Sequence, residues 1–136
     1  MNYFLAKTDP ETYSIDHLAH DRKTVWDGVR NAQALRAIGE MRTGDRVFIY
    51  HSMGDPSIVG LAKVASSPRP DPKDAKLTVV DFEFVSKLEP PTTLREIKEG
   101  GLFPDWALVR QSRLSTMSVP PAFVEWMRKR YGKTKI

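Results

Sequence analysis

The sequence predicts an α+β fold in which about five short strands form a small barrel or a strongly bent sheet. Three observations support this: apolar runs of strand length, hairpin-like pairs of such runs, and short helical patterns placed between or after them. A parallel βαβ fold is disfavoured, because only one good helix lies between successive strands and no glycine-rich phosphate loop follows a strand. The length of 136 residues fits a single domain, 1–136.

Strands are predicted where a short apolar run ends at a turn signal. The first run stops near Asp9-Pro10 and should have neighbours on both sides. The next two flank the turn at Gly54–Pro56 and should pair as a hairpin. A later segment alternates apolar and acidic side chains, as a half-buried strand does, and stops at Pro90-Pro91. The expected strands are Tyr3–Ala6, Val47–His51, Ile58–Ala65, Leu77–Leu88 and Leu114–Val119.

Helices are predicted where a capping side chain precedes an amphipathic stretch. Ser14, Asn31 and Thr93 can each accept a backbone N–H at a helix start, and Pro121 suits the first turn of a last helix. The Pro-rich segment between the strands should instead form a loop. The expected helices span Ser14–His20, Ala32–Met41 and Thr93–Lys98, with one more starting at Pro121, and the expected loop is Ser66–Lys76.

The net charge of +4 arises from the C-terminal end of the chain. Five of the 21 Lys and Arg residues follow Met127, where no acidic residue occurs, so residues 1–127 carry a net charge of −1. This basic tail, 128–136, is expected either to contact phosphates or to form a solvated, frayed end. The rest of the chain therefore has no excess of basic residues.

Composition excludes several classes of protein. The longest apolar runs are about five residues, whereas a membrane span needs about 20. The start of the chain lacks the basic region of a signal peptide, and the absence of cysteine excludes disulfides and thiolate metal sites. We therefore expect a cytoplasmic protein with no membrane partner, monomeric by default.

Catalysis has little support in the sequence. His17 and His20 have the spacing of metal ligands, but they lie on a short polar helix that is better explained as solvated surface. His51, Ser52 and Asp55 supply the residue types of a catalytic triad, yet neighbouring side chains on a strand point to opposite faces. No nucleophile elbow or Walker motif occurs. We predict that the protein is not an enzyme and uses no metal or cofactor.

Binding has better support, from three clusters of polar and aromatic residues. In Trp26–Gln33, a tryptophan can stack on a base, carboxylate and amide groups can bind its Watson–Crick edge, and Arg30 can hold a phosphate. The same residues also fit a core tryptophan followed by a capped helix. The second cluster, Phe48–Ser52, ends a strand and can either deliver polar groups to a rim or use its hydroxyls to satisfy local backbone groups. The third, Arg110–Ser115, can hold a phosphate or form a solvated loop.

At these clusters the sequence resembles the EVE domain family of the PUA-like superfamily. The combination Trp-Asp-Gly-Val-Arg-Asn followed by Tyr-His-Ser is specific, and the matching segments follow the family's order over nearly the whole chain. The resemblance implies a PUA-like β pseudo-barrel of five to six strands with short flanking helices. The matching segments include Lys7–Pro10, Tyr13–Ile15, Trp26–Asn31, Gln33-Ala34, Gly44-Asp45, Phe48–Ser52, Ile58–Gly60 and Arg113–Ser115.

The resemblance also implies a pocket near Trp26 that accepts a modified base flipped out of DNA or RNA. The residues implied in base contact are Lys7 and Thr8 at the floor, Trp26 as the stacking face, Asp27 and Asn31 at the base edge, and Tyr50, His51 and Ser52 along the wall. Those implied in phosphate contact are Arg30, Arg110, Arg113 and Ser115. Two alternatives stay open: a sensor of a small molecule or free nucleotide in the same pocket, and an enzyme that uses His51 or Asp27.

Overall fold

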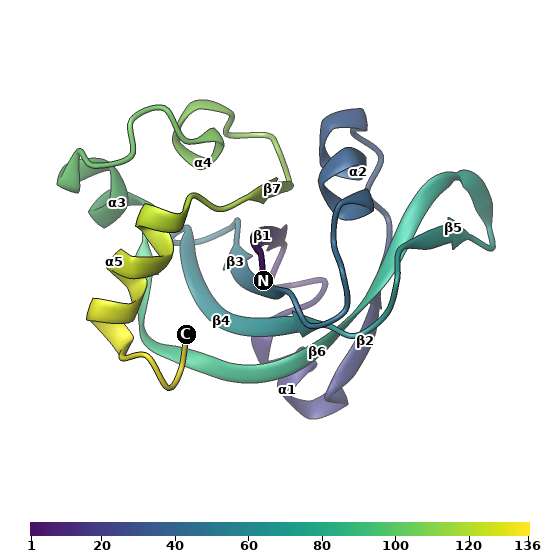
Figure 1. Ribbon diagram of the computed structural model, residues 1–136, viewed down its shortest axis with the longest axis horizontal. Coiled ribbons are helices and arrows are strands. Elements are labelled where there is room, and N and C mark those ends of the chain that lie inside the picture. The colour runs from purple at the N-terminus through teal and green to yellow at the C-terminus, as the bar shows by residue number, and fades with distance from the viewer.

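Seven strands and five helices make up the chain (Figure 1). The computed structural model describes residues 1–136. The strands are β1 (Tyr3–Thr8), β2 (Lys23–Trp26), β3 (Arg46–His51), β4 (Ser57–Val64), β5 (Arg69–Asp71), β6 (Asp74–Thr93) and β7 (Thr116–Ser118). The helices are α1 (Ile15–Asp21), α2 (Ala32–Gly39), α3 (Leu94–Gly100), α4 (Ala107–Arg110) and α5 (Pro121–Tyr131).

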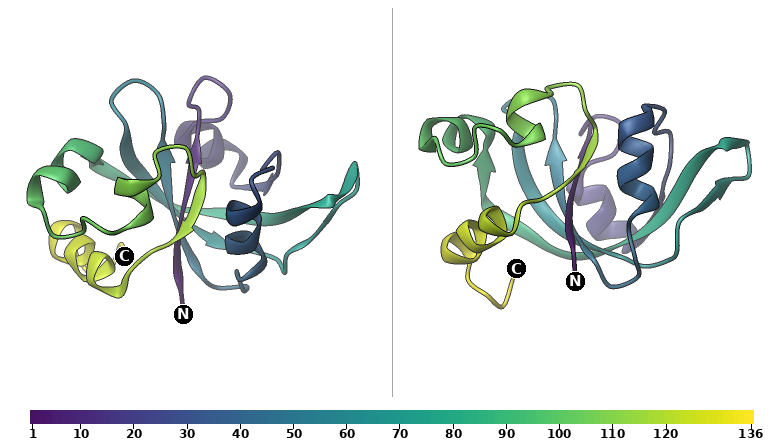
Figure 2. Two further views of the ribbon diagram at one scale, coloured as in Figure 1. Left: turned by 90° about the horizontal axis from the view of Figure 1, so that it is seen from above. Right: turned by 45° about the horizontal axis from the view of Figure 1, so that its top comes forward.

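The strands form one strongly bent sheet in the order β2-β6-β4-β3-β1-β7, with β5 paired to β6 off this path. β1 and β3 are parallel, and every other pair is antiparallel. Helix α2 packs beside β7 at one edge of the sheet, as both views of Figure 2 show. None of the helices is both long and apolar enough to cross a membrane. The predicted α+β class is confirmed.

The five predicted strands are all present, and the predicted hairpin is β3–β4. Two predictions about their limits are wrong. β6 continues through Pro90-Pro91, because the ladder to β4 is interrupted between Lys87 and Thr92 and a missing N–H there removes no sheet hydrogen bond. The expected loop at Ser66–Lys76 contains β5, which pairs only with β6 and therefore tolerates Pro70 as an edge strand does.

The three predicted helix caps are confirmed. The Ser14 Oγ accepts the His17 N–H at 3.2 Å, and the Asn31 Oδ1 accepts the Ala34 N–H at 3.0 Å. The Thr93 Oγ1 accepts the Glu96 N–H at 3.1 Å. These caps fix where α1, α2 and α3 begin. The cap at Asn31 also fixes the chain direction just after the Trp26 segment.

A cluster of 33 buried hydrophobic residues fills the inside of the bent sheet. α2 contributes Ala34 and Ile38 to it, and α5 contributes Phe123 and Met127. α1 lies so close to β4 that a Cβ at Gly60 would overlap the Ile15 side chain. The absence of a side chain at this position therefore sets the distance between α1 and the sheet.

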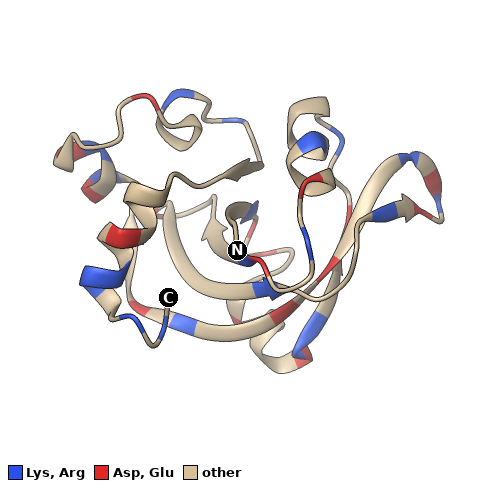
Figure 3. Ribbon diagram, viewed as in Figure 1, with Lys and Arg blue, Asp and Glu red and all other residues tan.

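The basic tail is packed against the body and is not a frayed end. Arg130 donates to Glu96 at 2.8 Å, and the Tyr131 hydroxyl donates to the Pro90 carbonyl. The Tyr3 hydroxyl donates to the carbonyl of Ile136, whose side chain is buried. Basic and acidic residues intermix over the elements in Figure 3, so the ribbon shows no continuous basic face in that view.

Candidate functional site

A cavity of about 480 Å³ opens where β1 and β2 end. It brings together half of the site residues expected from the sequence: Lys7, Thr8, Trp26, Asp27, Arg30 and Ser115. The remaining lining residues are Asp9, Thr12, Tyr13, Thr24, Val25, Gly28 and Val29.

Trp26 belongs both to the core and to this cavity. β2 pairs it with Val80, and its ring packs against Phe82 with the ring centroids 4.9 Å apart. The edge-on contact with Tyr13 spans 6.2 Å between centroids. Only 7% of Trp26 is exposed, so the ring is held rigidly by its neighbours. Trp26 is therefore a core residue, part of which forms a cavity wall, and its stacking on a base stays a prediction.

Lys7 and Thr8 lie where the cavity meets the end of β1. The Thr8 Oγ1 donates to the Tyr13 carbonyl at 2.7 Å, which ties the loop after β1 to the strand. The Lys7 Nζ donates to the Ser112 carbonyl at 3.0 Å, and burial lowers the pKa of this amine. Lys7 thus fastens the 110–115 segment beside the cavity.

Asp27 and Arg30 are exposed residues at the cavity mouth, in the loop between β2 and α2. Gly28 between them has φ of +77°, a left-handed conformation that favours glycine. Four arginines form ion pairs, namely Arg69, Arg110, Arg128 and Arg130. Arg30 forms none, and Asp27 has no ion-pair partner either, so an acceptor and a planar cation are both available to a ligand.

Three more of the expected residues line a neighbouring cavity of about 310 Å³: Asn31, Arg110 and Arg113. Asn31 uses its side-chain oxygen to cap α2, which leaves its amide N–H groups as donors. Arg110 pairs with Asp105 at 3.0 Å on the surface, whereas Arg113 has no ion-pair partner. Arg113 is therefore the freer of the two predicted phosphate ligands.

Tyr50, His51 and Ser52 line neither cavity, in contrast to the expected wall. The His51 Nε2 accepts the Ile15 N–H at 3.1 Å at the start of α1, and burial lowers the pKa of its ring. The Ser52 Oγ donates to the Thr8 carbonyl at 3.3 Å. Tyr50 is buried beneath the Lys7 Nζ, and burial raises the pKa of its hydroxyl to about 12. These residues therefore lie outside both cavities, and His51 and Ser52 bind different partners.

Sequence reasoning did not assign Tyr13 or Thr24 to the site. Thr24 lies two residues before Trp26 on the same strand, so the period of two along a strand could have identified it. Tyr13 approaches the cavity through the loop after β1, where its hydroxyl donates to the Asp21 carboxylate at 2.9 Å. Only the folded loop brings Tyr13 beside Trp26, so no local pattern marks it.

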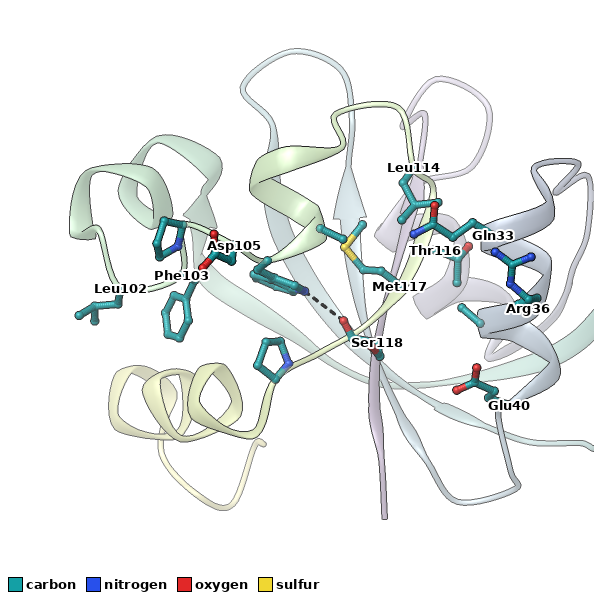
Figure 4. Close-up of a pocket in the computed structure, with 15 residues that line it drawn as sticks. Gln33, Arg36, Glu40, Leu102, Phe103, Asp105, Leu114, Thr116, Met117 and Ser118 are labelled. Atoms are coloured by element: carbon teal, nitrogen blue, oxygen red, sulfur yellow. Dashed lines mark hydrogen bonds between the residues drawn. The ribbon is translucent and has the colours of Figure 1, made fainter.

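A third and larger cavity, of about 600 Å³, forms a groove between α2 and the 102–118 segment (Figure 4). One wall is the α2 face formed by Gln33, Arg36 and Glu40, of which only Gln33 belongs to a cluster that the sequence singles out. The groove also contains apolar and aromatic side chains. Its other lining residues are Ala37, Leu102, Phe103, Pro104, Asp105, Trp106, Ala107, Leu114, Thr116, Met117, Ser118 and Pro120. Elsewhere, no three His, Asp or Glu side chains gather in a way that could hold a metal ion.

The sequence matches the EVE domain family over residues 2–130. Among curated proteins, mouse (Mus musculus) thymocyte nuclear protein 1 is 33% identical, over 84% of this chain and 66% of that protein. Human thymocyte nuclear protein 1 is 30% identical, over 84% of this chain and 67% of that protein. The chain therefore spans about two thirds of the length of these relatives.

Solved structures of related proteins are also similar to this chain. Rpa0253 from Rhodopseudomonas palustris is 34% identical, with a TM-score of 0.90 over 97% of this chain and 94% of that chain. The human THYN1 protein, solved in complex with DNA containing 5-methylcytosine, is 25% identical, with a TM-score of 0.88 over 98% and 99%. An ASCH protein from Zymomonas mobilis shares only the fold, at 10% identity and a TM-score of 0.59 over 94% of each chain.

Proposed function

Because this chain belongs to the EVE domain family, we propose that it binds a modified base of DNA or RNA, without catalysis, in the cavity at Trp26. One observation carries the proposal: a fixed aromatic ring, an unpaired carboxylate and an unpaired guanidinium converge on a single cavity. The solved complex of the human relative with 5-methylcytosine DNA makes modified cytosine the first ligand to test.

The residues of the cavity fit the parts of a nucleotide. Stacking of a base on the open part of Trp26 contributes about 1–3 kcal/mol. The Asp27 carboxylate can accept a hydrogen bond from the exocyclic amino group of cytosine. A fully buried methyl group on the base adds about 0.8 kcal/mol of binding free energy. Arg30 and Arg113, which line neighbouring cavities, can bind the flanking phosphates, and Ser115 adds a hydroxyl at the cavity wall.

The surroundings of His51 argue against the enzymatic alternative. Its Nε2 already accepts a backbone N–H, and it lies outside the cavity that holds Trp26. A general base must reach the proton that it abstracts. Asp27 is exposed to water and has no hydrogen-bond partner that would orient it as a general base.

The direct test compares the binding of 5-methyl-2′-deoxycytidine and of oligonucleotides that carry 5-methylcytosine or cytosine. We expect Asp27→Asn to weaken binding about tenfold or more, because it removes a charged acceptor, and Trp26→Phe to weaken it less. The matched control for Arg30→Ala is Arg95→Ala, another exposed arginine without an ion pair, on the distant helix α3. Equal binding by the wild type, the Asp27 variant and the Arg30 variant would refute the proposal.

One observation favours the free-nucleotide alternative. The cavity lining contains two positive groups, Lys7 and Arg30, and two negative ones, Asp9 and Asp27. It therefore carries no net positive charge to attract the phosphate backbone of a strand. A salt titration separates the two functions: if Arg30 and Arg113 both bind phosphates of a single strand, log affinity should fall against log salt with a slope of about −1.4. A slope near zero, with no gain in affinity from flanking nucleotides, would instead support the sensor.

The expected monomeric state and cytoplasmic location both stay predictions. The mouse and human relatives carry the word nuclear in their names. Size-exclusion chromatography of the purified protein and imaging of a tagged protein in its own cells would test the two predictions.

A further inference from the structure

We propose that the groove between α2 and the 102–118 segment is a second nucleotide subsite, which takes a base flanking the one bound at Trp26. This inference rests on the proposed function and deepens it. It assigns the choice of sequence context around the modified base to a set of residues outside the Trp26 cavity.

The position of the groove supports this assignment. The Trp26 cavity, the cavity at Arg113 and the groove are all lined by the same two parts of the chain, 7–40 and 102–120. Leu114 lines both the Arg113 cavity and the groove, and Arg30 of the first cavity precedes Asn31 of the second. A strand with its modified base at Trp26 can therefore pass Arg113 and enter the groove.

Thr116 gives the groove an unused polar edge. The residue is only 1% exposed, it lines the groove, and its Oγ1 has no hydrogen-bond partner. The backbone N–H of Lys7 donates to the Ser115 carbonyl, and that of Val119 donates to the Tyr3 carbonyl. Because hydrogen-bonded and non-hydrogen-bonded pairs alternate along an antiparallel ladder, Thr116 turns its own N–H and C=O away from β1. Buried polar groups nearly always have partners, so the Oγ1 without a partner indicates where the polar edge of a ligand binds.

The α2 wall carries side chains that are suited to base edges. Gln33, Arg36 and Glu40 project from one face of the helix toward the strand that bears Thr116 (Figure 4). Neither Arg36 nor Glu40 forms an ion pair, although several other charged residues of the surface do. Amide, guanidinium and carboxylate groups are the side chains that discriminate between bases.

The opposite wall carries apolar and aromatic side chains. Trp106 is fixed because its Nε1 donates to the Ser118 carbonyl at 3.0 Å, and Phe103 packs edge-on against it with centroids 6.4 Å apart. An apolar wall facing a mixed set of donors and acceptors fits a nucleobase. A phosphate fits less well, because Glu40 and Asp105 add negative charge to the same groove.

The experiment uses Thr116→Val, which keeps the shape of the side chain and removes its unpaired hydroxyl. The probes are 5-methyl-2′-deoxycytidine and a single DNA strand with one central 5-methylcytosine, in which each flanking nucleotide is replaced in turn by an abasic site. Ser86→Ala is the matched control, because Ser86 in β6 carries the other buried hydroxyl without a partner and lines none of the three cavities.

For the wild type, we expect one flanking position at which an abasic site lowers affinity about tenfold. Thr116→Val should lower affinity for the intact strand about fivefold, leave nucleoside binding unchanged and not lower the melting temperature. Ser86→Ala should leave both affinities unchanged. Arg36→Ala, an exposed position, should reduce the same abasic effect and provides a second variant if Thr116→Val is unstable.

The outcomes separate the two proposals. If the nucleoside and the strand bind but no flanking abasic site matters, and both variants bind like the wild type, the second subsite is overturned and the proposed function stands. A melting temperature that falls for Thr116→Val but not for Ser86→Ala, with an unchanged abasic profile in Arg36→Ala, also overturns it. If neither probe binds the wild type, the proposed function fails first.

Discussion

At the scale of single residues, His51 makes the protein sensitive to pH. Burial lowers the pKa of its ring despite the nearby Asp16, so below about pH 6.5 the unfolded state binds more protons than the native state. The free energy of unfolding should therefore decrease as pH falls below this value, until the pH lies below the pKa of His51 in the folded protein.

We expect this decrease to be shallower in His51→Gln, whose side-chain oxygen can still accept the Ile15 N–H. Urea unfolding at several pH values between about 5 and 7.5 would measure it. His20→Gln is the control, because His20 is exposed on α1. Parallel pH profiles for the wild type and His51→Gln would contradict this account.

Gly60 offers a second prediction for a single residue. A methyl group there would overlap Ile15, so Gly60→Ala should lower the free energy of unfolding by about 1–3 kcal/mol through overpacking. At Gly39, near the end of α2, a Cβ meets nothing within 4 Å, so Gly39→Ala should raise it by about 0.5 kcal/mol. Denaturant unfolding of the pair measures both effects, and a neutral Gly60→Ala would show that α1 can shift away from the sheet.

At the scale of elements, Asn31 joins a helix to the site. Loss of its cap in Asn31→Ala should cost about 1 kcal/mol of unfolding free energy. Asn31→Asp keeps a capping oxygen but has no amide N–H, so it should unfold like the wild type and bind a modified strand more weakly. A stable Asn31→Asp protein with unchanged binding would limit Asn31 to its structural role.

Local patterns predicted the elements with strong apolar periodicity or a capping residue, such as Ala32–Gly39 and Ser57–Val64. They did not reveal β2, because only Thr24 and Trp26 of its four residues turn inward, which is too short a pattern to show alternation. They also ended β6 at Pro90, because the interruption in the ladder that accommodates this proline exists only in the folded sheet.

The candidate site likewise contains residues whose proximity follows from the sequence and residues whose contacts arise only in the folded chain. Trp26, Asp27 and Arg30 follow one another along the chain, so the sequence itself placed them together. The family resemblance predicts Tyr50 and His51 in the wall, and their strand does end next to the site, where the register pairs His51 with Thr8. The His51 ring instead turns to α1, a contact between distant segments that the strand pattern does not contain.

At the scale of the whole molecule, the basic tail is expected to contribute to stability. Removal of residues 128–136 eliminates the Arg130–Glu96 ion pair, the contact of Tyr131 with Pro90 and the burial of Ile136. Burial of one aliphatic side chain contributes about 1.5–3 kcal/mol, so the truncated chain should melt at a clearly lower temperature, as calorimetry would measure.

The matched control replaces Lys129, Lys133 and Lys135 by alanine, which removes charge from exposed positions without ion pairs. This variant should keep the melting temperature of the wild type. If it loses as much stability as the truncation, the charges and not the packing hold the tail in place.

The length of β6 also has a consequence for the dynamics of the molecule. Its 20 residues pair with β2, β4 and β5, and at Phe82 the strand has a neighbour on each side. Opening this part of the strand would separate both flanking strands and expose a fully buried ring, so its amide protons should exchange with solvent only through unfolding of the whole domain. The amides of β7, at the far edge of the sheet, can exchange through local opening beside the groove, and the ratio of the two exchange rates would report how independently that edge moves.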